Sequence, residues 1–205
     1  MDNKTVKERI VEILDTTFQV IDQCYTYNYE SLKNKPNFNN AGSRIMFPSY
    51  RNGDCRISEQ ELRFLFIEKF NQYCQYTGWN AFYSVETPTK NPHNFSGIKS
   101  QSALFDVCIY DERGKRICLI EFKALNPPKS DYIKDFVKLN KEKVSPRFFV
   151  QLLKAQDSGT ITNIRRKIEP SINNVDYVCH TLNPNCRRTE YISNDIKKDG
   201  WIKLK

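Results

Sequence analysis

The stretch Ser102–Leu125 reads SALFDVCIYDERGKRICLIEFKAL and decides how the rest of the chain is arranged. Two runs within it are rich in apolar, β-branched and aromatic residues: 103–110 and 116–125. The Asp-Glu-Arg-Gly-Lys between them has the composition of a tight turn, so the stretch predicts a β-hairpin. Neither run alternates apolar with polar residues, which predicts central strands covered on both faces. Charges inside such strands are costly, and Asp106, Glu121 and Lys123 therefore need an explanation.

Strand geometry places these three charges near one another. Side chains two residues apart share a face, so Glu121 and Lys123 point the same way. If the turn is centred on Arg113 and Gly114, Asp106 lies opposite Glu121, and a bulge at Gly114 would shift this pairing by one residue. Two carboxylates on one sheet face beside a lysine suit a hard divalent cation such as Mg²⁺. The alternative is a buried ion pair of Lys123 with one carboxylate that only helps to specify the sheet.

A strong helix is predicted where the sequence reads SEQELRFLFIEKFNQYCQ, beginning at Ser58. Ser58 followed by Glu61 has the spacing of a capping box, which gives Glu61 a structural task. Glu59 instead falls close to the apolar stripe of the helix, so we expect it to point inward over the sheet. The alternative is that both glutamates only complement the helix dipole.

Asp106, fourteen intervening residues and then Glu121-Phe122-Lys123 resemble the PD-(D/E)XK nuclease superfamily, which has the restriction-endonuclease-like fold. Phe105 stands in place of the proline of the motif, and the resemblance covers about 56–182. It implies a nuclease that uses Mg²⁺ or Mn²⁺ to hydrolyse phosphodiester bonds, with DNA favoured over RNA and a role in restriction, defence or repair.

The resemblance also implies roles for individual residues. Asp106 and Glu121, with the backbone carbonyl of Phe122, would hold the metal ion, and Lys123 would orient the attacking water and stabilise the transition state. The superfamily often carries a glutamate on the helix before its core strands. This catalytic and metal-binding role falls on Glu59, with Glu61 as the second choice.

The remaining segments alternate between helix and strand. Further strands are predicted at 80–87, 147–155 and 175–181, and helices at 3–33, 131–142 and 160–173. This order predicts an α/β sandwich with a mixed sheet, and the resemblance makes it a restriction-endonuclease-like α/β/α sandwich with an added N-terminal helix. We expect residues 1–55 to pack as helix and long loop on a nuclease-like domain of residues 56–205.

Two of the predicted elements carry more specific expectations. In the helix over 131–142, the apolar pattern turns Ile133, Phe136, Val137 and Leu139 inward. The segment 201–205 alternates like an edge strand, and it would pair with the sheet or with a second copy of the chain as a homodimer.

The amino-acid composition limits the kinds of partner that the protein is expected to bind. The 205 residues carry a net charge of +8, which favours a polyanion such as DNA through phosphate contacts, although many soluble proteins are simply basic. No run approaches ~20 apolar residues, so no membrane partner is expected. The seven cysteines have no framework spacing, which indicates reduced thiols in a cytoplasmic protein.

Three basic residues are candidates for nucleic-acid binding: Arg56, Lys90 and Lys99. The two lysines lie in a loop over 87–101 that would border the site, and Arg56 follows the long loop over 35–54. Two other classes of function remain open. One is a non-catalytic nucleic-acid-binding module on the same fold, and the other is a structural protein whose charges form a buried network.

Overall fold

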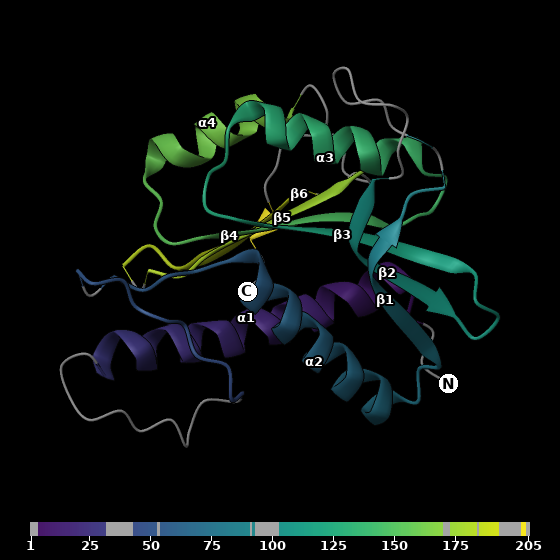
Figure 1. The fold of residues 1–205 in the computed structure, drawn as a ribbon, viewed down its shortest axis with the longest axis horizontal. Coiled ribbons are helices and arrows are strands. Elements are labelled where there is room, and N and C mark those ends of the chain that lie inside the picture. The colour runs from purple at the N-terminus through teal and green to yellow at the C-terminus, as the bar shows by residue number, and fades with distance from the viewer. Residues whose placement is uncertain are drawn as a thin grey trace.

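The computed structural model describes residues 4–31, 43–52, 54–90, 92, 103–169, 173–183, 185–192 and 202–203. In this part of the chain a mixed, open β-sheet lies between two layers of helices (Figure 1). The expected α/β class and its sandwich-like layering are confirmed at this level.

The described residues form four helices and seven strands in the order that the alternating sequence pattern predicts, with one additional strand. The helices are α1 Val6–Ser31, α2 Glu59–Thr77, α3 Lys129–Lys141 and α4 Ser158–Ile168. The strands are β1 Ala81–Pro88, β2 Leu104–Asp111, β3 Arg116–Ala124, β4 Arg147–Leu153, β5 Asp176–Thr181, β6 Arg188–Ile192 and β7 Ile202–Lys203. The sequence did not indicate β6, whereas β7 pairs with β6 at the edge of the sheet, one of the two pairings expected for the C-terminal segment.

The sheet is antiparallel at both ends and parallel in the middle. Strands β1, β2 and β3 form an antiparallel meander, β3, β4 and β5 are parallel, and β6 and β7 return antiparallel. The spatial order of the strands follows the chain order from β1 to β7. The two parallel connections run through α3 and α4, which therefore lie on the same face of the sheet.

The hairpin of β2 and β3 has the predicted register near the site. Val107 pairs with Ile120, and continuing this register by one residue brings Asp106 opposite Glu121. The register shifts between Ile109 and Tyr110, where Ile117 of β3 is the extra residue, so the bulge lies in β3 and leaves the pairing next to the site unchanged. The turn itself places Gly114 at φ 73°, a conformation that glycine adopts without a Cβ clash.

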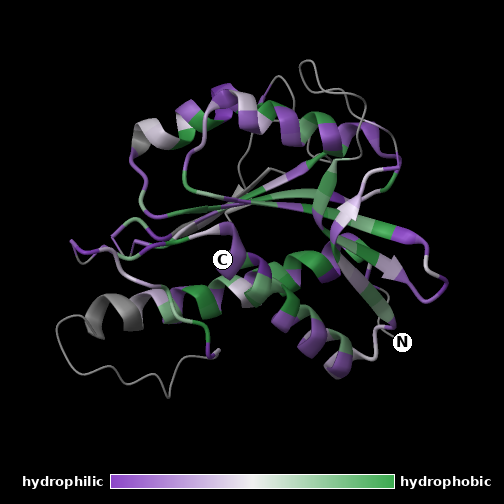
Figure 2. Cartoon of the chain, in the orientation of Figure 1, coloured by the Kyte–Doolittle hydropathy of each residue, from purple (hydrophilic) through white to green (hydrophobic). Residues whose placement is uncertain are grey.

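Two hydrophobic cores lie on opposite faces of the sheet, as predicted for central strands covered on both sides. The first core joins α1 and α2 to one face, and the second joins α3 and α4 to the other. Figure 2 shows the apolar residues of the central strands between helices whose outward surfaces are hydrophilic. The N-terminal stripe of Ile10, Leu14, Phe18 and Ile21 is buried in the first core, so α1 belongs to the fold rather than standing apart from it.

Helix α3 is rotated from the orientation that its apolar pattern predicts. Phe136 and Leu139 are buried as expected, but Ile133 and Val137 are 38% and 37% exposed, and that part of the prediction is wrong. The face toward the sheet instead carries Tyr132, Asp135 and Lys138 in addition to Phe136 and Leu139. The charged side chains of β3 explain the rotation, because they need buried partners of opposite charge.

Candidate active site

Asp106 is held in place by the neighbouring strand. Its Oδ2 accepts a hydrogen bond of 2.7 Å from the backbone N–H of Phe122, across the β2–β3 pair. Its Oδ1 lies 3.6 Å from Nη1 of Arg63 on α2, which also pairs with Glu86 of β1. Burial raises the pKa of Asp106, while the Phe122 N–H and the charges of Lys138 and Arg63 act against this rise.

Glu121 is a buried carboxylate with a buried ammonium as its partner. It is 3% exposed, and its Oε1 lies 2.7 Å from Nζ of Lys138 on α3. The same ammonium donates a 2.8 Å hydrogen bond to the carbonyl oxygen of Leu104 and lies 3.4 Å from Asp135. Burial raises the pKa of Glu121 well above its ordinary value, even though Lys138 favours the charged form.

Lys123 is surrounded by carboxylates. Its Nζ lies 2.9 Å from Oδ2 of Asp135 and 3.6 Å from Oε1 of Glu59. Burial lowers the pKa of Lys123, but Asp135, Glu59 and Glu121 outweigh burial, so its pKa lies above the ordinary value. The side chain is therefore a cation at neutral pH.

The structure separates the two glutamates at the start of α2. Glu59 faces Lys123, and burial raises its pKa against the opposing effect of the Lys123 charge. Glu61 lies on another side, where it pairs with Arg56 at 3.0 Å and accepts a hydrogen bond from the Ser58 hydroxyl. Ser58 is the N-cap, but its side chain makes no hydrogen bond to the helix backbone, so the predicted capping box is not formed.

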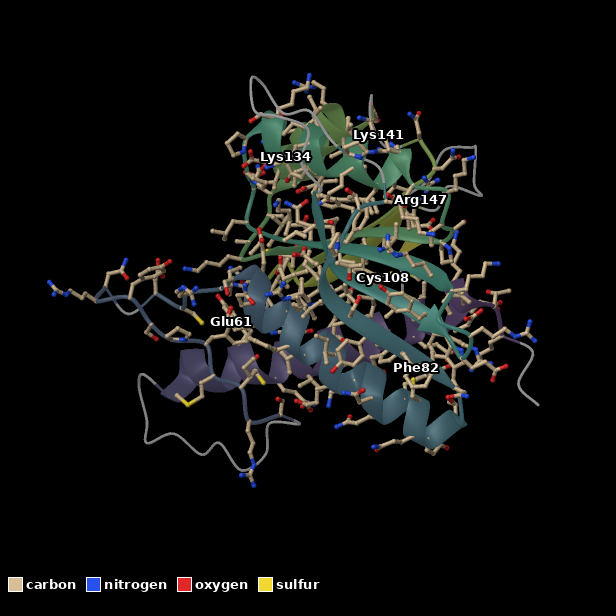
Figure 3. The ribbon with its side chains drawn as sticks, turned by 45° about the vertical axis from the view of Figure 1, so that its right-hand side comes forward. Glu61, Phe82, Cys108, Lys134, Lys141 and Arg147 are labelled. Atoms are coloured by element: carbon tan, nitrogen blue, oxygen red, sulfur yellow. The ribbon has the colours of Figure 1, made fainter. Side chains whose placement is uncertain are left out.

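These residues make up one group, which we call the carboxylate cluster. Its acids are Glu59, Asp106, Glu121 and Asp135, and its cations are Arg63, Lys123 and Lys138. The four residues predicted from sequence for catalysis therefore lie together, where the start of α2 meets β2 and β3. Figure 3 shows α2, with Glu61, and α3, with Lys134 and Lys141, on opposite sides of the sheet that carries the cluster.

The sequence reasoning missed Asp135 and Lys138, although a signal was present. They stand three residues apart in the helix that follows the Glu-Phe-Lys triplet, and both charges flank the apolar Phe136. Residues at this spacing share a helix face. The helix that carries this charged pair covers two buried charges of the preceding strand. The pair is therefore a candidate partner for those strand charges.

The metal ligands proposed from sequence are oxygen donors, which suit Mg²⁺ or Mn²⁺. Within the described part of the chain, however, no three His, Cys, Asp or Glu side chains are placed to hold a metal ion together. The ammonium of Lys138 lies against Glu121 and near Asp135, where it supplies one positive charge to oxygens that would otherwise attract a cation.

The candidate nucleic-acid contacts lie apart from these ion pairs. Arg56 pairs with Glu61, outside the cluster. Lys90 follows β1, and its backbone N–H donates a 2.8 Å hydrogen bond to Glu142 at the end of α3. Lys99 lies outside the described residues. Neither Arg56 nor Lys90 is joined to the carboxylate cluster by an ion pair in the described chain.

Comparison with known proteins gives no relative from which a function could be transferred. No protein-family model matches the chain, and no curated protein or solved structure matches it. None of the described helices is long and apolar enough to cross a membrane. All seven cysteines are free thiols.

Proposed function

We propose that this protein is a metal-dependent nuclease of the PD-(D/E)XK type, with a restriction-endonuclease-like fold, that hydrolyses phosphodiester bonds in nucleic acid. One observation carries the proposal: Glu59 of α2, Asp106 of β2, and Glu121 and Lys123 of β3 lie in one charge cluster. The net charge of +8 supports a polyanionic substrate. DNA is preferred over RNA on the resemblance alone.

Asp106 and Glu121 would hold an Mg²⁺ or Mn²⁺ ion, with the Phe122 carbonyl and Glu59 as further oxygen donors. Such an ion would acidify a bound water and neutralise the charge that develops on the scissile phosphate. The raised pKa values of Asp106 and Glu121 support this assignment, because buried carboxylates that ionise reluctantly gain the most from a nearby cation.

Lys123 acts as a fixed positive charge in this proposal. A lysine that serves as general base needs a lowered pKa, whereas Asp135 and Glu59 raise the pKa of Lys123 against the effect of its burial. A protonated Lys123 can orient a phosphate oxygen or the attacking water and stabilise the transition state. Asp135 is a positioning residue, because its carboxylate lies 2.9 Å from Nζ and holds the ammonium in place.

Lys138 and a divalent ion would compete for Glu121. The ammonium lies 2.7 Å from Oε1, so it would repel a divalent ion bound to the same carboxylate. Metal binding therefore requires Lys138 to turn from Glu121 toward Asp135 or solvent. This competition predicts weaker metal binding by the wild-type protein than by a variant without the ammonium.

The proposal is tested with purified protein on supercoiled, linear and single-stranded DNA and on RNA, in Mg²⁺, Mn²⁺ or EDTA. We expect metal-dependent cleavage that is lost in Glu121→Gln and Lys123→Met. Glu112→Gln is the matched control, because this exposed acid lies in the hairpin turn away from the cluster. Folded wild-type protein that cuts none of these substrates with either metal would overturn the proposal.

A second candidate is a non-catalytic nucleic-acid-binding module on the same fold. The neutralisation of Glu121 by Lys138 and the lack of a three-ligand group among the described residues favour it. Under this alternative, wild-type protein binds nucleic acid without cutting it, and Lys138→Met binds equally well. Metal-dependent cleavage lost in Glu121→Gln would exclude this alternative.

A further inference from the structure

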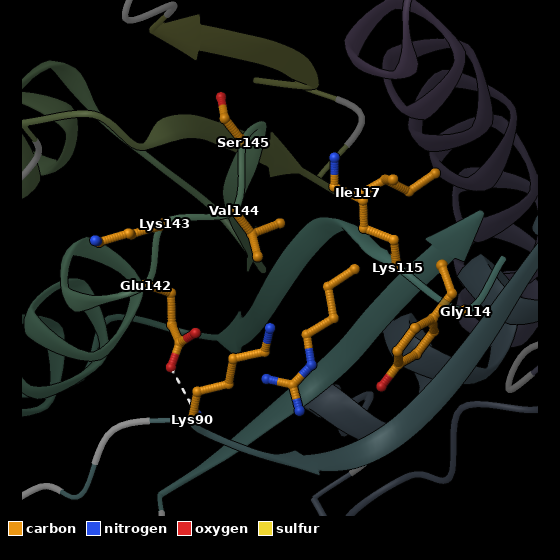
Figure 4. Close-up of a pocket in the computed structure, with 10 residues that line it drawn as sticks. Lys90, Gly114, Lys115, Ile117, Glu142, Lys143, Val144 and Ser145 are labelled. Carbon is orange, nitrogen blue, oxygen red and sulfur yellow. Dashed lines mark hydrogen bonds between the residues drawn. The ribbon is translucent and has the colours of Figure 1, made fainter.

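A cavity of about 740 Å³ lies beside the β2–β3 hairpin. Its walls come from three parts of the chain: the hairpin from the end of β2 to the start of β3, Lys90 two residues after β1, and the segment that joins α3 to β4. Figure 4 shows Lys90 beside Glu142 at this cavity, with Lys143 and Val144 on the joining segment. The residues of the carboxylate cluster are not among those that line the cavity.

The cavity is strongly basic. Lys90, Lys115, Arg116 and Lys143 line it, and no ion pair joins any of these side chains to an acid within the described residues. Among the described residues that line the cavity, Glu142 is the one acid, and its Oε1 accepts the 2.8 Å hydrogen bond from the Lys90 backbone. Four positive charges facing one carboxylate would attract an anion into the cavity.

The guanidinium of Arg116 adds a second observation. Its Nη2 donates a 2.9 Å hydrogen bond to the carbonyl oxygen of Pro88, but its Nη1 is buried and has no hydrogen-bond partner. A buried donor without a partner is costly in a folded protein, most of all on a charged group. An anion bound beside Arg116 would offset this charge.

The rest of the lining is apolar or aromatic. Tyr110 and Val144, which pack against the second core, form this part of the wall, whereas Ile117 packs against the first core on the other face of the sheet. The Tyr110 ring is held by a 3.0 Å hydrogen bond between its hydroxyl and that of Ser84. The volume lies within the range of about 300–1,000 Å³ that is usual for small-molecule sites. The lining therefore suits a ligand with an anionic part and a flat or apolar part.

We propose that this cavity binds a ligand of the nucleotide class. Its phosphate groups contact Lys90, Lys115 and Lys143, and its base lies against Tyr110 and Val144. The nucleotide is either free or part of a nucleic-acid strand, because both present the same chemistry. The proposal does not depend on hydrolysis at the carboxylate cluster, since the two sites share no residue.

Isothermal titration calorimetry of the full chain in EDTA tests the proposal with four probes: ATP, AMP, tripolyphosphate and a ten-nucleotide oligothymidylate. EDTA keeps metal-dependent cleavage from contributing heat. We expect ATP to bind more tightly than tripolyphosphate, because the base adds apolar contact. Lys115→Glu with Lys143→Glu should weaken binding by more than about tenfold, because attraction is replaced by like-charge repulsion. Both lysines are exposed, so the double variant should fold.

The matched control is Lys129→Glu with Arg166→Glu, which makes the same charge change at exposed positions outside the cavity. It should change the affinity by less than about threefold. If only the oligothymidylate binds, and if the cavity variant binds it more weakly, the proposal is supported. The nucleotide in the cavity is then part of a nucleic-acid strand. The proposal is overturned if no probe binds, if the two double variants behave alike, or if neither ATP nor the oligothymidylate binds more tightly than tripolyphosphate.

Discussion

Replacing Lys138 by methionine removes the ammonium that neutralises Glu121 and retains much of the side-chain volume. The ion pair is well buried, because the Lys138 and Glu121 side chains are 7% and 4% exposed. The substitution also removes the hydrogen bond to the Leu104 carbonyl and the contact of Nζ with the Phe105 ring, whose centroid lies 5.5 Å away. Methionine has a helix propensity close to that of lysine, so α3 itself should persist.

The magnitude follows from the geometry of the pair. At the observed 2.7 Å and an effective dielectric constant of about 20, the Coulomb attraction is about 6 kcal/mol. The energy needed to bury both charges offsets much of this attraction. Removing one partner leaves the other charge buried without compensation, and this typically lowers stability by about 3–5 kcal/mol. We expect Lys138→Met to lie in this range at pH 8.

Urea denaturation in EDTA at pH 8, with the double variant Lys138→Met/Glu121→Gln beside the single one, measures this effect. The double variant should recover at least about 2 kcal/mol, because it leaves no unpaired charge at Glu121. A loss below about 1 kcal/mol in Lys138→Met would refute the reasoning, since it would mean that Glu121 does not depend on the ammonium. Equal losses in the single and double variants would also contradict it.

Three further predictions concern the same part of the molecule. Mn²⁺ should raise the melting temperature of Lys138→Met more than that of the wild type. A free Mn²⁺ concentration of about 100 times the dissociation constant adds about 2.7 kcal/mol to the free energy of unfolding. Equal shifts in the two proteins would argue against competition at Glu121. The pKa of Glu121 is raised above 4.5 by burial, so the folded state binds its proton more tightly than the unfolded state does. In EDTA, the free energy of unfolding of the wild type should therefore fall relative to that of Glu121→Gln as the pH rises from about 4.5 through the raised pKa. Urea denaturation at several pH values measures this difference. A wild type that gains stability relative to Glu121→Gln over the same pH range would contradict the prediction. On α3, Phe136→Ala should lower the free energy of unfolding by about 3–5 kcal/mol and Val137→Ala by less than about 1 kcal/mol, as measured by urea denaturation. The reason is that Phe136 is fully buried, whereas Val137 is 37% exposed. Similar losses at the two positions would contradict the orientation of α3.

The hairpin and its charges could be predicted from sequence because the information is local. A continuous apolar run, a glycine in the turn and the two-residue period of a strand together determine that Asp106 lies opposite Glu121. The choice of Glu59 over Glu61 for the cluster follows from helix geometry in the same way.

The orientation of α3 could not be predicted by the same means. Hydrophobic periodicity turns Ile133 and Val137 inward, but the buried charges of β3 attract Asp135 and Lys138 of the following helix, and this pairing across the fold is not part of the helix's own apolar pattern. Strand β6 was missed because its sequence, RTEYI, is polar and lacks a strong strand pattern, and it forms through pairing with β5 and β7.

The division of the interior into two cores has a consequence for when Glu121 can be reached. Each helical layer buries its own set of apolar side chains, so the α3–α4 layer can detach locally while α1 and α2 remain packed. Such an opening carries Lys138 and Asp135 away with α3 and uncovers both Glu121 and Lys123, while Glu59 stays near Lys123 and Asp106 keeps its hydrogen bond with Phe122. The free energy of this partial opening, which amide hydrogen exchange in α3 reports, then sets the fraction of molecules whose Glu121 is accessible.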